Sequence, residues 1–259
     1  MSKDLQHVLQ DWPGGPDAPV ARKFTTSDGQ VFLQLRIDLG VLQMTIDGRP
    51  DGERPEGYPT YLDLVRDLIN RRPEAGVSED HFRELGREML QFYRRRVTLI
   101  ALARQARLND DLDEADACYR RAIRDANHNL AVLDLLHEVG ARIEFGDEHE
   151  QYRAYILMQR ATCRAERALL VQDPDTAIEH LKAGVNAIQA CAEDEYEDGE
   201  DLSPYIAELR RFERHIRRRY RRRRTLREQL QDAIAAENFE QAARLRDALA
   251  ERAREHDRS

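Results

Sequence analysis

The sequence predicts a mainly helical fold: an irregular helical bundle, a small N-terminal β-hairpin unit, and a C-terminal helical hairpin carried on a long basic helix. Two observations favour this class. Charged residues make up 35% of the chain and hydrophobic residues 41%, which is too apolar for a disordered chain and typical of helices with much exposed surface. From residue 78 onward, apolar residues recur at helical spacing, whereas the two-residue period of a strand is confined to residues 30–46.

Residues 1–72 are expected to form the β-containing unit. Residues 31–37 alternate apolar and polar side chains, which predicts a strand with one buried face, and residues 41–46 predict a second strand. We expect residues 1 to about 22 to be a loose arm held to the body by Trp12. Prolines and glycines exclude regular structure from the loop 48–59. One apolar helical stripe is expected to cover the strand face, namely Leu62, Val65 and Ile69.

Residues 73–192 are expected to form a bundle of paired helices. Residues 96–129 resemble one tetratricopeptide repeat, with inner-face residues Leu99, Leu102, Ala103, Ala106, Ala115, Tyr119 and Ala122. Residues 158–191 resemble a second copy through Ala165, Ala168, Ala177, Leu181 and Gly184. The two copies are much further apart than the roughly 34-residue period of tandem repeats. This spacing favours one irregular bundle over a solenoid, and ordinary helix packing is the alternative explanation of the pattern.

Two blocks of charge follow the bundle. Residues 193–203 are expected to be an exposed acidic linker, and residues 204–259 a basic helix followed by a hairpin. Ten arginines and one acid lie between residues 210 and 224. Three interpretations stay open: the arginines bind nucleic-acid phosphates, pair with the acidic linker, or form a solvated helix face. The candidate nucleic-acid-binding residues are Arg217, Arg218, Arg219, Arg221, Arg222, Arg223 and Arg224.

Residues 226–253 contain two amphipathic helical patterns, one directly after the other. The first pattern is an apolar stripe formed by Leu226, Leu230 and Ile234. Residues 237–239 interrupt it, and a second stripe follows in Ala242, Leu245 and Leu249. Alanines on an inner stripe allow two helices to approach closely. The pattern therefore predicts a tight antiparallel helical hairpin.

Residues 239–247, which read FEQAARLRD, resemble the F-E-x-A-A-x-L-R-D core of the UVR motif. That motif occurs in bacterial excision-repair subunits, in some Clp-type chaperone ATPases and in small adaptors of those ATPases, where the hairpin is a docking element. The resemblance implies a protein partner, either another UVR-type hairpin or a second copy of this chain. The implied partner-binding residues are Leu226, Leu230, Phe239, Ala242, Ala243, Leu245, Arg246, Asp247 and Leu249. The adaptors usually carry CxxC zinc sites, and this sequence has none.

No motif for catalysis, phosphate binding or metal binding is found in the sequence. We therefore expect a non-enzymatic interaction protein without a cofactor or a metal. The alternative is a nucleic-acid-associated accessory factor of excision repair that uses the arginine-rich helix, although a net charge of −8 disfavours general nucleic-acid binding. Three dispersed cysteines fit a reducing cytoplasm, and no apolar run is long enough to span a membrane.

Overall fold

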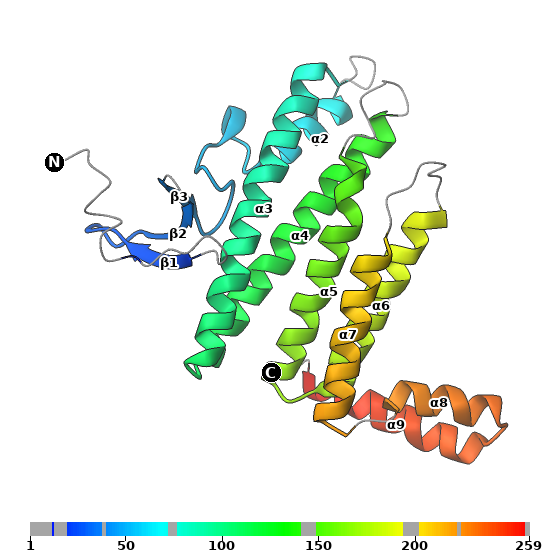
Figure 1. Cartoon of the computed structure of the whole chain (residues 1–259). Coiled ribbons are helices and arrows are strands. Elements are labelled where there is room, and N and C mark those ends of the chain that lie inside the picture. Colours follow the sequence, from blue (N-terminus) through cyan, green and yellow to red (C-terminus); the bar gives the residue numbers. More distant parts are fainter. Residues whose placement is uncertain are drawn as a thin grey trace.

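A computed structural model describes Trp12 and residues 20–37, 40–71, 77–140, 149–193, 202–221 and 224–256. These residues are mainly helical, with a small sheet beside the bundle (Figure 1), which confirms the predicted fold class. The strands are β1 (Val20–Thr25), β2 (Val31–Ile37) and β3 (Gly40–Thr45). The helices are α2 (Tyr61–Arg71), α3 (Glu79–Leu108), α4 (Leu112–Gly140), α5 (Arg153–Leu170), α6 (Pro174–Glu193), α7 (Ser203–Arg219), α8 (Leu226–Ala235) and α9 (Phe239–His256).

The strands form one antiparallel sheet in the order β1-β2-β3. Leu35 in the central strand lies opposite Ala21 on one side and Leu42 on the other. The sequence pattern predicts β2 and β3 but misses β1, because residues 20–25 lack a clear apolar alternation. As expected, Trp12 is buried, and the Arg22 guanidinium lies 4.0 Å from the centre of its ring.

Helices α3 and α4 cover the sheet, so the prediction that α2 covers it is wrong. Leu33 and Leu35 are buried in one apolar cluster with Leu99 of α3 and residues of α4. The two ends of the strand are more exposed than the alternation predicts, at 39% for Val31 and 43% for Ile37. The sheet therefore has a buried centre and partly open ends.

Helix α2 packs elsewhere on the bundle. Leu62 and Val65 are buried in a second apolar cluster with Phe82 of α3. The Pro/Gly loop, residues 48–59, leads the chain away from the sheet along α3 before α2 begins (Figure 1). The helical stripe in α2 is therefore a real apolar face, but its partner is α3 rather than the sheet.

Buried charges tie the Pro/Gly loop to the bundle. Arg95 of α3 donates from Nε and Nη2 to both carboxylate oxygens of Asp125 on α4, at 2.7 and 2.9 Å. Its Nη1 donates to the backbone carbonyls of Thr45 and Gly48, at 3.1 and 2.8 Å. Because all three nitrogens are engaged, this buried guanidinium fixes the start of the loop against both helices.

A second buried pair lies under the same loop. Arg49 is 4% exposed, and its Nε lies 3.2 Å from Asp51 and 3.6 Å from Glu88 of α3. Glu88 also accepts hydrogen bonds from the backbone N–H groups of Tyr61 and Leu62, at 2.7 and 3.1 Å. Glu88 thus caps α2 from the neighbouring helix.

The bundle is built from the helix pairs α3/α4 and α5/α6, which use the same turn. In the first pair Asp110 has a φ of 61°, and the N–H of Asp111 donates to the carbonyl of Ala106 at 2.9 Å. In the second pair the equivalent residues are Gln172 (φ 57°), Asp173 and Ala168, again at 2.9 Å. A residue with positive φ and a bond back into the last turn form a Schellman-type helix end.

The aspartate of each turn then caps the second helix. The carboxylate of Asp111 accepts the N–H of Glu114 at 3.1 Å, and that of Asp173 accepts the N–H of Thr176 at 2.9 Å. Each turn therefore ends one helix and begins the next within a few residues. This explains why long helices are joined here by very short connections.

The predicted inner-face residues of both pairs are buried, which confirms the pairing, while the tetratricopeptide likeness itself stays a prediction. Gly184 of α6 has a structural reason to lack a side chain: an added Cβ would lie 2.4 Å from the Cβ of Ala161 on α5. The thiols of Cys118 and Cys163 are core groups, and burial raises the pKa of each to about 12.

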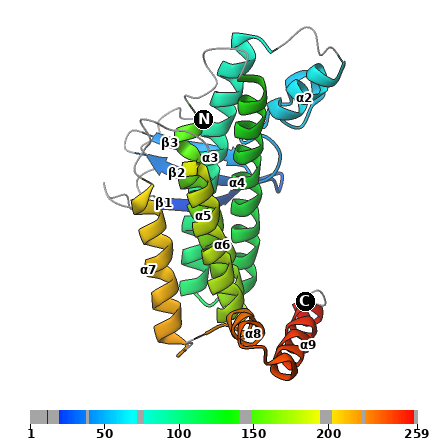
Figure 2. The ribbon, with the colours of Figure 1, turned by 90° about the vertical axis from the view of Figure 1, so that its right-hand side faces the viewer.

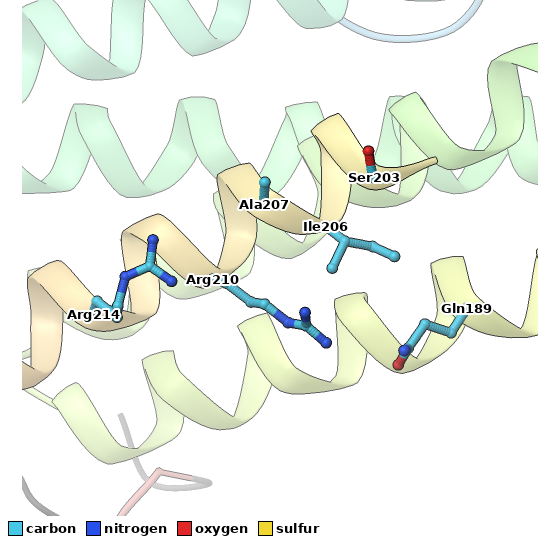
Figure 3. Close-up of a pocket in the computed structure, with 6 residues that line it drawn as sticks. All are labelled: Gln189, Ser203, Ile206, Ala207, Arg210 and Arg214. Carbon is cyan, nitrogen blue, oxygen red and sulfur yellow. The ribbon is translucent and has the colours of Figure 1, made fainter. Parts of the chain in front are cut away.

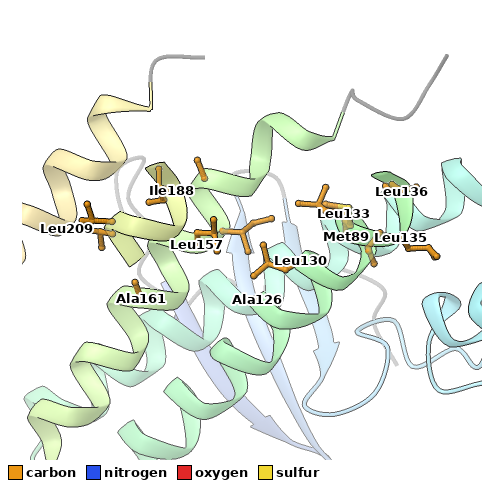
Figure 4. Close-up of a cluster of buried hydrophobic side chains, with 14 of the residues drawn as sticks. Met89, Ala126, Leu130, Leu133, Leu135, Leu136, Leu157, Ala161, Ile188 and Leu209 are labelled. Carbon is orange, nitrogen blue, oxygen red and sulfur yellow. The ribbon is translucent and has the colours of Figure 1, made fainter. Parts of the chain in front are cut away.

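One apolar cluster runs across α3, α4, α5, α6 and α7 (Figure 4). Helix α7 contributes Leu209 and Ile216 to it, and so packs as part of the bundle. The same cluster contains residues of α2 and α3, which lie on either side of the predicted boundary at residue 72. The division of the chain into domains stays a prediction. Residues 194–201 of the predicted acidic linker lie outside the described residues. None of the described helices meets the length and apolarity that a membrane crossing requires.

Candidate functional site

Helices α8 and α9 form the predicted hairpin, at one end of the bundle (Figures 1 and 2). Its connection repeats the turn of the two bundle pairs. Glu237 has a φ of 55°, and the N–H of Asn238 donates to the carbonyl of Ala233 at 2.8 Å. The Asn238 side chain then accepts the N–H of Gln241 at 3.1 Å and caps α9.

Small residues occupy the inside of the hairpin. Ala233 is 4% exposed and Ala242 is 9% exposed. Five predicted partner-binding residues are half-buried: Leu226, Leu230, Ala243, Leu245 and Leu249. The predicted Arg246 and Asp247 pair with each other on the surface at 3.0 Å. The close approach of the two helices thus depends on alanine, as the sequence predicts.

Two apolar side chains at the closed end of the hairpin face solvent. Phe239 is 70% exposed and Ile234 is 54% exposed. The expectation that Ile234 lies on the inner stripe is wrong, because Ala233 takes the inner position at the end of α8. Phe239, which the sequence pattern places in the interruption between the two stripes, begins α9 directly after its cap. Neither helix contributes to the two apolar clusters of the body. The hairpin therefore presents apolar surface that no described residue covers.

Polar contacts hold the open end of the hairpin on α6 and α7. Thr225 caps α8 in a reciprocal box with Glu228, and its hydroxyl donates to Glu179 of α6 at 2.7 Å. Glu228 accepts hydrogen bonds from Lys182 of α6 at 3.0 Å and from Arg217 of α7 at 2.8 Å. We call these five residues the hairpin joint. Sequence reasoning misses this joint, because its members are distant in the chain.

The electrostatics of the joint favour its charged form. Burial alone would raise the pKa of Glu228, but hydrogen bonds from Arg217, from the Thr225 N–H and from Lys182 lower it to about 2. Glu228 is therefore a carboxylate throughout the physiological pH range. Because the contacts are ionic and partly exposed, salt weakens them more than it weakens the apolar core.

The structure separates the predicted nucleic-acid-binding arginines into two groups. Arg217 is 20% exposed and pairs with Glu213 and Glu228, and Arg224 pairs with Asp232. Three others are exposed and form no ion pair with a described residue: Arg218, Arg219 and Arg221. Arg222 and Arg223 lie outside the described residues. The arginine block is thus partly a structural element of the joint and partly open surface.

A hollow of about 400 Å³ lies between α6 and α7 (Figure 3). Its lining residues are Gln189, Ser203, Ile206, Ala207, Arg210 and Arg214. Figure 3 shows Arg210 reaching from α7 into the space between the two helices. Sequence reasoning predicts the amphipathic helix but misses this hollow, which depends on how α7 packs.

Comparison with known proteins identifies the hairpin. Residues 221–251 match the family model described as the UvrB/uvrC motif, so the exposed hairpin carries a UVR motif. The match begins at the joint and includes the closed end with Phe239. Neither the curated proteins nor the solved structures contain a match to the chain.

Proposed function

From a UVR motif on an exposed hairpin, we propose that this protein docks a protein partner through α8 and α9. The observation that carries the proposal is the solvent-facing apolar pair at the closed end, Phe239 and Ile234, within the matched segment. Large apolar side chains that are exposed close together, here on the two sides of one short turn, are typical of an interaction surface. The role is a non-enzymatic one, in which the body supports the hairpin.

The size of the exposed surface sets the strength of the contact. Fully burying a side chain such as phenylalanine or isoleucine contributes about 1.5–3 kcal/mol. The half-buried stripe, with Leu230 and Leu245, adds a smaller amount. Association costs of at least about 4 kcal/mol offset much of this gain. We therefore expect micromolar binding at best, which fits a partner with a similarly small surface, such as another UVR-type hairpin.

The test is to replace Phe239 by alanine in the full-length chain. Phe239 packs little against its own chain, so Phe239→Ala should leave the fold intact and remove the docking surface. Leu112→Ala is the matched control, because Leu112 follows the cap of α4 as Phe239 follows that of α9, and it is also exposed, at 42%.

Two measurements show whether the hairpin binds a second copy of this chain or a different protein. Sedimentation velocity over a range of concentrations reports self-association, and quantitative affinity purification from the source cells reports a different partner. We expect Phe239→Ala to lose the association and Leu112→Ala to keep it. Equal association of both variants and the unmodified chain would contradict docking through the closed end.

The second candidate is binding of nucleic-acid phosphates, and it is favoured by three exposed arginines that form no ion pair within the described part of the chain. Arg218, Arg219 and Arg221 are exposed at the end of α7, next to the joint. If they contact phosphates, retention on DNA should fall steeply with salt. A triple alanine variant should then lose most of the retention. Retention that is the same in the triple variant would exclude this role for the helix.

A further inference from the structure

Arg96, in the middle of α3, is a buried cation that forms no ion pair with a described residue. It is 1% exposed, and its Nε donates to the side-chain oxygen of Gln159 on α5 at 2.7 Å. Its Nη1 is buried and has no hydrogen-bond acceptor among the described residues. The preceding Arg95 is equally buried but has the Asp125 carboxylate as its partner.

A lone buried charge is a costly arrangement. Removing a guanidinium from water costs several kcal/mol unless an opposite charge and good hydrogen bonds compensate. Consistently, burial lowers the pKa of Arg96. The Asp125 carboxylate favours the charged form of Arg96 from a distance, but it is already paired with Arg95. The structure therefore contains a cationic site whose counter-charge is not among the described residues.

The described polar neighbours of Arg96 are neutral, and their hydrogen-bonding groups are already engaged. Gln159 uses its oxygen for Arg96, and its Nε2 donates to the hydroxyl oxygen of Tyr155 at 2.8 Å. Burial and the neighbouring Tyr93 raise the pKa of Tyr155, so its phenol stays neutral and keeps its proton. What this cluster lacks is an acceptor with negative charge.

The cluster reaches the surface through a row of aromatic rings on three helices. The Arg96 guanidinium lies 5.7 Å from the ring centre of Tyr93, which is 37% exposed. The ring centres of Tyr93 and Tyr155 are 6.2 Å apart, and those of Tyr155 and Tyr205 on α7 are 6.0 Å apart. One turn before Tyr93, Leu90 is 47% exposed. A ligand here would meet an apolar, aromatic surface beside one buried cation.

We propose that Arg96 is an anion-binding site that takes the carboxylate of an acidic peptide lying on Tyr93 and Tyr155. Rotation of the partly exposed Tyr93 ring admits the carboxylate to Nη1. A carboxylate fits better than a phosphate, because one guanidinium balances one negative charge and matches the planar carboxylate group. This site lies on the body and is independent of docking by the hairpin.

The first test measures the melting temperature of the full-length chain in sodium acetate and in sodium chloride at matched ionic strength. Binding to the folded state should raise the melting temperature by about 2–4 °C once acetate reaches about ten times its dissociation constant. Arg96→Met should abolish the difference between the two salts. Arg94→Met, at an exposed position on the same helix, should keep it.

The second arm asks where the carboxylate comes from. The probes are the capped tripeptide acetyl-Ala-Glu-Ala-amide and its Gln counterpart, and only the Glu peptide should raise the melting temperature. Residues 193–201 contain seven acids, so a variant with amides at those positions is measured in parallel. If the chain itself supplies the carboxylate, acetate will stabilise that variant and not the unmodified chain.

The overturning results are equally definite. An acetate response that persists in Arg96→Met, or one that is absent from both the unmodified chain and the amide variant, excludes the site. Should Arg96→Met fail to fold, the Nε–H resonance of Arg96, assigned through the backbone, replaces that comparison. Its shift on titration with acetate in the unmodified chain or the amide variant supports the proposal, and constancy in both overturns it.

Discussion

Three helical hairpins in this molecule share one turn, and the third differs from the other two in what surrounds it. The alanine that closes each turn is buried to nearly the same degree, with Ala106 at 7%, Ala168 at 6% and Ala233 at 4% exposure. The exposure of the residue after the cap increases along the series, since Pro174 is buried in the second hairpin, Leu112 is 42% exposed in the first and Phe239 is 70% exposed in the third. Local turn chemistry therefore makes each hairpin, and neighbouring helices decide whether its surface is covered.

The comparison also separates two kinds of stability. The pairs α3/α4 and α5/α6 contribute to the apolar clusters of the body, so loss of their packing affects the whole fold. Hairpin α8/α9 is outside both clusters and is attached through the joint at Glu228. Damage to the third hairpin should remain local, because it can open without the body unfolding.

The largest contrast is expected for leucine-to-alanine changes at equivalent positions of the first and third hairpins. Leu99 is fully buried, so Leu99→Ala should lower the free energy of unfolding by about 2–5 kcal/mol. Leu226 is half-buried at the base of α8, and Leu226→Ala should cost less and leave the main transition in place. Urea unfolding followed by circular dichroism measures both. Equal losses would show that the third hairpin unfolds together with the body.

A second contrast concerns the tightest helix contact. Gly184 of α6 and Leu249 of α9 occupy equivalent positions, but a Cβ on Gly184 would lie 2.4 Å from that of Ala161. Gly184→Ala should therefore destabilise the body by about 1–3 kcal/mol through overpacking. Leu249→Ala removes a half-buried side chain and should leave the melting temperature of the body unchanged. A stabilised Gly184→Ala variant would mean that α5 and α6 are free to move apart.

The shared turn gives a third, smaller contrast. Loss of an N-cap typically costs about 1 kcal/mol. Asp173→Ala should lower the global stability by this amount, because α6 lies in the body. Asn238→Ala should instead speed hydrogen exchange only at the amides of α8 and α9. Faster exchange throughout the body in Asn238→Ala would contradict this expectation, because it would show that the third hairpin is coupled to the body through the joint.

The smallest expected effect is the pH dependence of the joint. Because folding lowers the pKa of Glu228 from 4.5 to about 2, the carboxylate contributes stability above pH 4.5 that is lost as the pH falls toward 2. Glu228→Gln should remove this part of the pH dependence. Hydrogen exchange of the α8 amides at pH 5 and pH 3 measures it, with Glu240→Gln on exposed α9 as the control. A similar pH response in Glu228→Gln would rule out Glu228 as the titrating group.

The sequence predicts what depends on neighbours in the chain. The helix pairs and the C-terminal hairpin follow from local periodicity, caps and small residues, and the structure confirms them. At the end of α8 the prediction is one position off, because Ala233 rather than Ile234 faces inward. Features that join distant segments were missed, such as the contact between Arg96 and Gln159. No local pattern in one sequence specifies which buried arginine receives a carboxylate and which does not.

The position of the sheet also has a consequence for synthesis on the ribosome. Strands β1 to β3 are made before the helices that cover them, α3 and α4, which end at Leu108 and Gly140. At roughly 5–20 residues per second, the face with Leu33 and Leu35 waits several seconds for its cover. During that interval the sheet has an uncovered apolar face and unpaired edge strands, which can pair with other chains. The nascent sheet is therefore expected to need protection until α4 is complete, whereas hairpin α8/α9 is made after α6 and α7, the helices that hold it.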